Sequence, residues 1–291
     1  MSHVLVLIAP PERRLDPSTV ATLASHLGGG APTWLSPGRA CEFALPNPHA
    51  ATGAALPSHI DSAVLPRAGR RKRMLVADMD STIITSESLD ELAAFAGIKD
   101  EIAAITRRSM NGEIDFADAL RERVAMLKGL ERAALDRVIA DMALMPGAAA
   151  LVATMRAHGA FTALVSGGFT QVTSAVRARV GFDIDRGNDL EFADGRLTGR
   201  VLEPILDKNA KLATLKALAA ERGLDPADTL AVGDGANDLP MLLAAGLGVA
   251  FQAKPSVAAA ARVRIEQGDL TALLYLQGYR DDEIVRPPGT S

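Results

Sequence analysis

The chain has 291 residues, of which 48% are hydrophobic and 23% charged; these fractions are typical of a folded globular protein and exclude a disordered or low-complexity chain. The 31 basic and 35 acidic residues give a net charge of −4, which argues against nucleic-acid binding because affinity for phosphate backbones needs an excess of Lys and Arg. A single cysteine, Cys41, excludes an intramolecular disulfide and a thiolate zinc cluster, and the lack of a secretory signal or a bilayer-spanning apolar run predicts a cytoplasmic protein with no membrane partner.

The first 66 residues are predicted to form a small α+β domain. Residues 4–8 are a β-branched apolar run that is typical of a strand. Asp16, Pro17 and Ser18 then predict a helix start, with an acidic N-cap and proline at the first helical position. A further strand is expected around residues 41–45, within a βαββ pattern. Such patterns are common in regulatory and dimerisation modules, so a homodimer stays open.

Residues 67–73 contain five basic side chains in seven positions. One interpretation is a patch that binds phosphate or nucleic acid. The other is a solvated linker between domains, which we favour because no aromatic residue is interleaved and the whole chain is acidic. The linker opens a second domain, expected over residues 67–291.

From Met74 onward, strands alternate with helices, which predicts an α/β domain with a parallel, Rossmann-like sheet. Three apolar runs, residues 74–77, 160–165 and 229–232, each end abruptly in small or acidic residues. In open parallel sheets, the carboxyl ends of the strands are where ligands bind. Three such endings in one chain indicate a ligand site rather than core packing.

A long helical insert separates the first two of these strands. We expect helices over residues 88–96, 100–109, 116–128 and 131–142. A crossover between parallel strands needs only one helix, so the insert, at about residues 87–145, is interpreted as a helical-bundle cap over the strand ends. Further along the chain, Asp194 and Gly195 predict a hairpin within residues 189–201.

The first strand ends in Asp78, Met79 and Asp80, so two carboxylates two residues apart leave the strand on one side. They repel each other unless a cation is present, and a hard divalent cation such as Mg²⁺ suits oxygen ligands. One carboxylate can then attack phosphorus while the other donates a proton to the leaving oxygen. The alternative to a metal site is that these residues form the N-cap of a helix. Asp234, which leaves the third strand in the same way, favours the metal site, and Asp238 follows in the next helix.

Two further elements suit a phosphate group. Ser166, Gly167 and Gly168 follow the second strand, and a hydroxyl with glycine amides can cradle a phosphate. Lys211 lies next to the buried leucine face of a predicted helix, where its ammonium group could reach a phosphoryl group. The alternative for Lys211 is an extended surface side chain.

Arg123 falls within the apolar stripe of a predicted cap helix. Phe116, Leu120 and Leu127 define that stripe, and Arg123 lies on the same face. An arginine on the inward face of a cap favours an anion receptor. The alternative is a salt bridge within the cap to Glu91 or Glu101.

The order of the motifs resembles one enzyme family. DMDST, VSGG, NAK and GDGAND, with a helical cap after the first, are similar to the haloacid-dehalogenase (HAD) superfamily of phosphatases. DFADALRERVAMLKGL, SGGF and ADGRLTG look like the phosphoserine phosphatases within it. The resemblance covers about residues 74–276. Bacterial members often carry a small regulatory ACT-type domain in front, of which residues 1–66 resemble a diverged version.

The resemblance implies a role for each acidic residue of the site. Asp78 would be the nucleophile that forms an aspartyl-phosphate, and Asp80 the general acid and then base. Magnesium would be held by the Asp78 carboxylate, the main-chain carbonyl of Asp80 and Asp234, with Asp238 in support.

It also implies the substrate contacts. Ser166, Gly167 and Lys211 would hold the phosphoryl oxygens, and Asn237 would face the substrate. Glu87 would meet the substrate ammonium group and Arg123 its carboxylate, which agrees with the helical-stripe argument.

The resulting hypothesis is Mg²⁺-dependent hydrolysis of O-phospho-L-serine to L-serine and phosphate, the last step of serine biosynthesis. The nearest alternative is a HAD phosphatase or phosphotransferase that acts on another small phosphomonoester. A non-catalytic module that senses amino acids or phosphate is a third reading, against which the intact Asp78 and Asp80 pair argues. The expected partner is therefore a small-molecule substrate and not a nucleic acid.

Overall fold

The computed structural model describes residues 2–110, 113–206 and 209–288. Its centre is a parallel sheet of six strands in the order β12-β11-β10-β5-β6-β7. Their bounds are β5 (Met74–Ala77), β6 (Phe161–Phe169), β7 (Ile184–Asn188), β10 (Thr229–Gly233), β11 (Leu247–Phe251) and β12 (Val263–Ile265). Every residue of β5, β10 and β11 is buried, as expected for strands covered on both faces. The Rossmann-like core predicted from the sequence is therefore confirmed.

Helices cover both faces of this sheet. Those on one face are α8 (Ala210–Glu221), α9 (Leu239–Ala244) and α10 (Pro255–Ala260). On the other face lie α6 (Ala148–Ala157), α7 (Thr170–Val180) and α11 (Ala272–Leu276). The chain also contains two short 3₁₀ helices, Pro226–Asp228 and Asp281–Glu283. None of the described helices is long and apolar enough to cross a bilayer.

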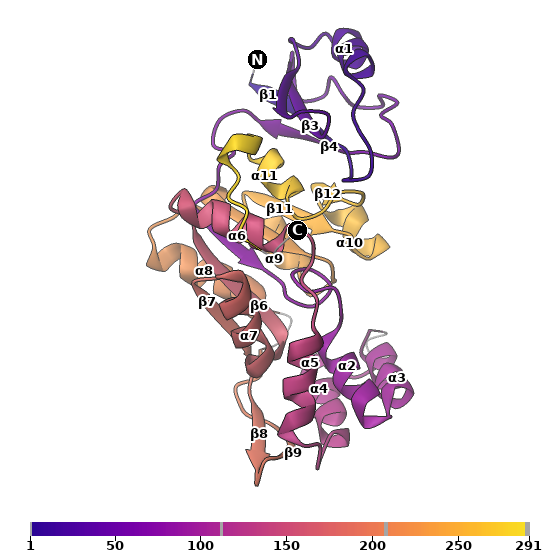
Figure 1. Cartoon of the computed structure of the whole chain (residues 1–291), viewed down its shortest axis with the longest axis vertical. Coiled ribbons are helices and arrows are strands. Elements are labelled where there is room, and N and C mark those ends of the chain that lie inside the picture. Colours follow the sequence, from indigo (N-terminus) through magenta and orange to yellow (C-terminus); the bar gives the residue numbers. More distant parts are fainter. Residues whose placement is uncertain (1, 111–112, 207–208, 289–291) are drawn as a thin grey trace.

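The insert after β5 folds into a four-helix cap beside the carboxyl ends of the strands (Figure 1). Its helices are α2 (Ser88–Ala96), α3 (Lys99–Met110), α4 (Phe116–Met126) and α5 (Arg132–Asp141). All four expected helices are present, with ends that differ from the expected ones by no more than two residues. The two chain segments that enter and leave the cap pair with each other, because Thr85 N–H donates to Ala143 and Met145 N–H donates to Ile83.

The predicted hairpin is also present, as β8 (Leu190–Ala193) and β9 (Arg196–Val201). Asp194 and Gly195 both have positive φ, 50° and 73°, as a tight two-residue turn requires. The hairpin packs on α4 and α5 of the cap, and Arg196 binds Glu131 at 2.6 Å.

Residues 3–66 form a separate antiparallel sheet in the order β2-β3-β1-β4. Its elements are β1 (His3–Ile8), α1 (Pro17–His26), β2 (Thr33–Ser36), β3 (Ala40–Leu45) and β4 (Asp61–Pro66). The pattern is therefore βαβββ, one strand more than the βαββ expected. Strand β2 is short and has a proline on each side, Pro32 and Pro37, which masks its strand pattern.

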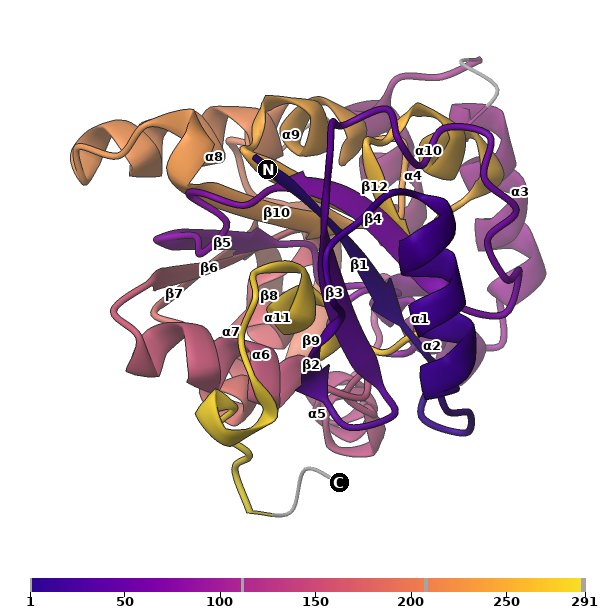
Figure 2. The ribbon, with the colours of Figure 1, turned by 90° about the horizontal axis from the view of Figure 1, so that it is seen from above.

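The two faces of this sheet are both covered. Leu5 and Leu7 of β1 pack with α1, whereas Val4, Val6 and Ile8 join the apolar core that contains α11. Figure 1 shows this sheet lying over α11 and β12, and Figure 2 shows α1 on its outer side. We propose that residues 1–66 and 67–291 are the two domains of the chain, with an apolar contact between them.

Asp61, at the start of β4, is the main polar contact between the two sheets. Only 5% exposed, it accepts main-chain hydrogen bonds from Glu266, Gln267 and Gly268, at 2.7–3.2 Å. Arg39 adds an ion pair to Asp269 at 2.7 Å. The loop after β12 is therefore fixed by the N-terminal sheet.

Asp61→Ala is expected to destabilise the whole chain. The substitution leaves three main-chain N–H groups without their acceptor. The N–H of Gly268 is buried, and an unsatisfied buried donor costs about 1–3 kcal/mol. Thermal or urea unfolding of the two proteins measures the difference. An unchanged unfolding midpoint would contradict the view that Asp61 holds the two sheets together. The effect of Asp61→Ala on the midpoint is compared with that of Asp16→Ala, which removes an exposed helix N-cap away from the contact between the sheets.

Candidate active site

Asp78 and Asp80 follow β5 and lie at the carboxyl edge of the sheet, between the core and the cap. Asp78 is only 5% exposed, and its Oδ1 accepts from the main-chain N–H of Met79 at 2.8 Å. Asp80 Oδ1 accepts from the N–H of Ser88 at 2.7 Å, and its Oδ2 accepts from Ser166 Oγ at 3.1 Å. Both carboxylates line a cavity of about 130 Å³.

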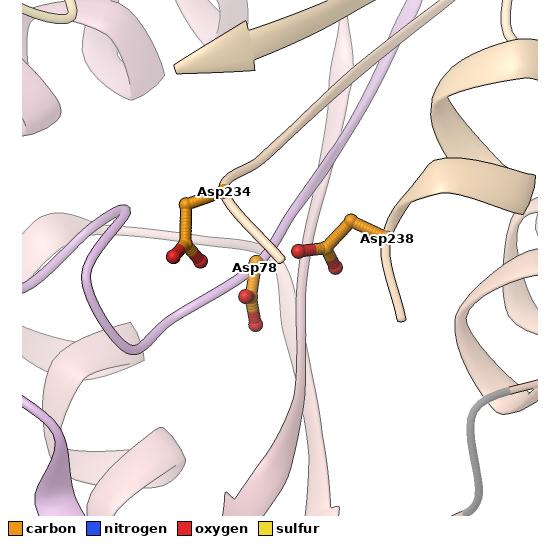
Figure 3. Close-up of side chains that lie close together, drawn as sticks. All are labelled: Asp78, Asp234 and Asp238. Carbon is orange, nitrogen blue, oxygen red and sulfur yellow. The ribbon is translucent and has the colours of Figure 1, made fainter. Parts of the chain in front are cut away.

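Asp234 and Asp238 complete an acidic cluster with Asp78. Carboxylate oxygens of the three residues lie within 4.8 Å of one another (Figure 3). Asp234 follows β10, and Asp238 is the residue just before α9. A Cβ at Gly233 would collide with the Asp238 side chain, so this approach requires glycine there.

Lys211 balances part of this negative charge. Its Nζ lies 2.6 Å from Asp78 Oδ1 and 2.5 Å from Asp238 Oδ1, and the lysine is 4% exposed. Burial opposes its charge, but Asp238 and Asp78 outweigh burial and raise the pKa of Lys211. Lys211 is thus a buried cation of the site rather than a surface lysine.

The carboxylates carry more negative charge than one lysine neutralises. Burial and the Asp238 carboxylate raise the pKa of Asp78 well above its ordinary value, and the same two causes raise the pKa of Asp234. A divalent cation would reverse both effects, because it would be the largest local charge.

The donor set fits a hard cation. Asp238 has both oxygens in use, with Oδ1 on Lys211 and Oδ2 on the N–H of Gly235 at 2.9 Å. Within the described residues, Asp78 Oδ2 receives no hydrogen bond, so it can bind a metal ion. Asp234 offers a further carboxylate oxygen in the same cluster. Oxygen-only donors of this kind suit Mg²⁺, and Asp238 acts as the support that holds Lys211.

The residues of the SGG motif lie beside Asp80 and line the same cavity. Ser166 is buried, and its Oγ accepts from the N–H of Gly168 at 2.8 Å. The sequence analysis placed these residues after the second strand, whereas they belong to the last part of β6, where its pairing with β7 is irregular. A Cβ at Gly167 would lie 3.0 Å from the Phe116 ring of the cap, so glycine allows the cap to come close.

The cap places Glu87 and Arg123 on the same cavity. Glu87 Oε1 accepts from Ser81 Oγ at 2.7 Å. Arg123 donates from Nε to the Ala119 carbonyl at 3.1 Å and from Nη1 to Thr106 at 3.3 Å. In the described part of the chain, Arg123 forms no ion pair, so the alternative of a bridge to Glu91 or Glu101 is wrong. Burial lowers the pKa of Arg123, as it does for a cation without a paired anion.

All the predicted site residues line this one cavity: Asp78, Asp80, Glu87, Arg123, Ser166, Gly167, Lys211, Asp234 and Asn237. Sequence reasoning missed several other lining residues, among them Lys254, Phe116 and Ser88. Lys254 follows β11, a fourth strand end at the same edge, which the strand-end argument could have included. Phe116 was assigned only to the apolar stripe, and Ser88 gives no signal in the sequence because its contact is a main-chain N–H.

Comparison with known proteins agrees with this geometry. The family model of haloacid dehalogenase-like hydrolases matches residues 75–243, more than half of the chain. A phosphoserine phosphatase of Streptococcus thermophilus is 46% identical over 205 residues, which are 70% of this chain and 95% of that protein. One of Streptomyces coelicolor is 46% identical over 215 residues, 74% of this chain but only 52% of that protein. The chain therefore spans about half the length of some relatives.

Solved structures show the same likeness. A HAD family hydrolase of Salmonella enterica serovar Typhi superposes with a TM-score of 0.81 at 30% identity, over 97% of this chain and all of that one. A substrate-bound phosphoserine phosphatase gives a TM-score of 0.66 at 36% identity, over 70% of this chain and 98% of that chain. The likeness to the first of these structures includes the N-terminal sheet.

Proposed function

Because the chain belongs to the haloacid dehalogenase-like hydrolase family, we propose that it hydrolyses O-phospho-L-serine to L-serine and phosphate. The observation that carries the proposal is one cavity that joins the Asp78 and Asp80 pair of the core to Glu87 and Arg123 of the cap. The first pair suits phosphoryl transfer, and the second suits an amino acid. Relatives 43–46% identical to this chain are phosphoserine phosphatases, which supports the same substrate.

In the first step, an Asp78 oxygen attacks phosphorus and the bond between phosphorus and the serine oxygen breaks. The leaving oxygen takes a proton from the Asp80 carboxyl group, so L-serine leaves as the neutral alcohol. Burial raises the pKa of Asp80, against the hydrogen bonds of Ser88 and Ser166 that lower it, and this favours a protonated group at the start.

In the second step, water attacks the phosphorus of the aspartyl-phosphate. The Asp80 carboxylate removes a proton from that water, the bond between phosphorus and the Asp78 oxygen breaks, and phosphate leaves. Both side chains return to their starting states, so the cycle is balanced. The net reaction is hydrolysis of one phosphomonoester.

The charges of the cavity match those of the substrate. Lys211, Ser166 and the amide of Gly167 are assigned to the phosphoryl oxygens, and Asn237 to the substrate side of the cavity. Arg123 is assigned to the carboxylate and Glu87 to the ammonium group. The Phe116 ring of the cap lies over Gly167 at this side of the cavity.

We assign Mg²⁺ to Asp78, Asp234 and the main-chain carbonyl of Asp80, where it would neutralise charge that develops on the phosphoryl oxygens. Its addition to metal-free protein is expected to switch on phosphate release from L-phosphoserine and to raise the unfolding temperature. Metal that binds only the folded state stabilises it by mass action, by about 2.7 kcal/mol at 100 times its Kd. Asp234→Asn should abolish both effects.

Phosphate release, L-serine formation and the unfolding temperature are measured with Mg²⁺ and with a chelator. Addition of acceptor alcohols tests for the alternative of a phosphotransferase, because transfer would yield less free phosphate than L-serine. Full activity in the chelator would contradict the metal assignment. Activity on other phosphomonoesters without activity on L-phosphoserine would contradict the substrate.

A further inference from the structure

The loop of residues 78–87 joins β5 to α2, and hydrogen bonds hold its two ends together. The N–H of Ser81 donates to the carbonyl of Ser86 at 3.3 Å, and Ser81 Oγ donates to Glu87 at 2.7 Å. The N–H of Ser88 closes the loop on Asp80 at 2.7 Å. The loop therefore ties Asp80 of the core to the first residue of α2.

Ser88 has a main-chain N–H that is free to make this contact. As the first residue of α2, it has no helical partner for its N–H, like the other residues in the first turn of a helix. The N–H groups of this turn also favour a negative charge, which suits the Asp80 carboxylate. The preceding residue, Glu87, offers no side-chain cap, so Asp80 takes the position of the capping acceptor.

This contact decides which Asp80 oxygen can carry a proton. A main-chain N–H only donates, so Oδ1 must accept and cannot itself hold the transferable proton on that side. Oδ2 accepts from Ser166 Oγ with one lone pair and has its other lone pair for the proton. The two contacts together fix the rotation of the carboxyl group, and loss of the Ser88 contact would free it to turn.

We propose that the main-chain N–H of Ser88 is a positioning group that holds Asp80 with Oδ2 toward the leaving oxygen of the substrate. The inference rests on the proposed role of Asp80 as general acid. It links the acid to the cap, because the donor belongs to α2 whereas the acid belongs to the core loop. Proton donation would thus depend on where the cap places the start of α2.

Ser88→Pro removes this N–H and places the proline Cδ where its hydrogen was, so the Asp80 carboxyl group both loses the hydrogen bond and is displaced from its position. Proline is favoured at the first position of a helix, where its missing N–H breaks no helical bond. It also requires an extended residue before it, and Glu87 already has φ −94° and ψ 111°. Ser88→Ala is the matched control. It keeps the N–H and removes only the hydroxyl, which meets no hydrogen-bond geometry within the described residues although it lies close enough to Asp80 to lower the pKa of that carboxyl group.

The readout is kcat/KM for two aryl phosphates, phenyl phosphate and p-nitrophenyl phosphate. Neither has an amino or carboxyl group, so the result is independent of amino-acid recognition by Glu87 and Arg123. Phenolate is the more basic leaving group and needs the proton more. Ser88→Pro should lower kcat/KM for phenyl phosphate about 10- to 100-fold, as expected for one hydrogen bond to a charged group. The value for p-nitrophenyl phosphate should stay within about threefold, because its leaving group needs little protonation.

Asp80→Asn separates failure of this inference from failure of the proposed mechanism. If Asp80→Asn lowers kcat/KM selectively for phenyl phosphate but Ser88→Pro does not, the positioning role of Ser88 is wrong and the role of Asp80 as general acid stands. If Asp80→Asn lowers both substrates alike, the acid role itself is wrong, and the inference with it. Equal losses on both substrates in Ser88→Pro, or the same selective loss in Ser88→Ala, would also overturn the inference.

A second variant covers the case in which the proline protein does not fold. Lactic acid in place of alanine at position 88, introduced by nonsense suppression, replaces only the N–H with an ester oxygen. Ser88→Ala is its matched control. The expected result is the same selective loss on phenyl phosphate at an unchanged KM for p-nitrophenyl phosphate, and the lack of that loss would overturn the inference.

Discussion

Asp78→Asn is expected to abolish phosphate release and formation of the phosphorylated enzyme. An amide oxygen is a poor nucleophile at phosphorus and the substitution removes a negative charge from the cluster with Asp234 and Asp238. Asp80, the other carboxylate after β5, is assigned to proton transfer, so no residue is placed to take over as nucleophile. Loss of a nucleophile costs a factor of about 10⁶ in enzymes where the group forms the covalent intermediate.

The measurement is acid quench of the enzyme with radiolabelled L-phosphoserine, followed by mapping of the labelled peptide. Wild-type protein should carry label on the peptide that contains Asp78. Mass spectrometry must confirm that the variant still contains Asn, because deamidation restores Asp. Turnover near the wild-type rate in a protein verified in this way would contradict the nucleophile assignment.

Arg123→Ala is expected to impair only substrates that carry a carboxylate. A guanidinium pairs with a carboxylate in a planar, often bidentate arrangement, so Arg123→Lys should restore little. Loss of one partner of a buried charge pair costs about 2–5 kcal/mol, which is roughly 30- to several-thousand-fold in kcat/KM. p-Nitrophenyl phosphate, without a carboxylate, should be nearly unaffected.

Arg121→Ala is the matched control for this experiment. Arg121 lies on the same helix, but its ion pairs to Asp118 and Glu203 are exposed and outside the cavity. Its loss should leave both substrates unchanged. If Arg123→Ala impairs both substrates alike and lowers the unfolding temperature, Arg123 is a structural residue of the cap that binds Ala119 and Thr106.

Local patterns were sufficient to predict the cap and the three central strands of the core sheet, β10, β5 and β6, but not β7, β11 and β12. Buried strands such as β5 and β10 are short apolar runs, and each ends in residues that have no place in a core. Arg123 was predicted to face inward because it breaks the apolar stripe of its own helix. These signals lie within a few residues of one another, so no long-range contact is needed to recognise them.

Contacts between distant segments could not be predicted in the same way. Asp61 lies 205–207 residues from the amides that it binds, and nothing near it in the sequence indicates an interface. The Ser88 contact uses a main-chain N–H, which any residue except proline could supply. The strand β2 forms because β3 offers an edge to pair with, although β2 has only four residues and a proline on each side.

The most direct test of the central claim is the ratio of kcat/KM for L-phosphoserine to that for D-phosphoserine and p-nitrophenyl phosphate, with Mg²⁺ present. In the proposed arrangement, Glu87 and Arg123 would bind two groups of the amino acid, and Lys211 and the metal would bind the phosphoryl group. Three binding points of this kind distinguish the enantiomers. We predict that L-phosphoserine is preferred over both. Equal values for the L- and D-isomers, or a preference for p-nitrophenyl phosphate, would contradict the claim that this cavity is built for L-phosphoserine.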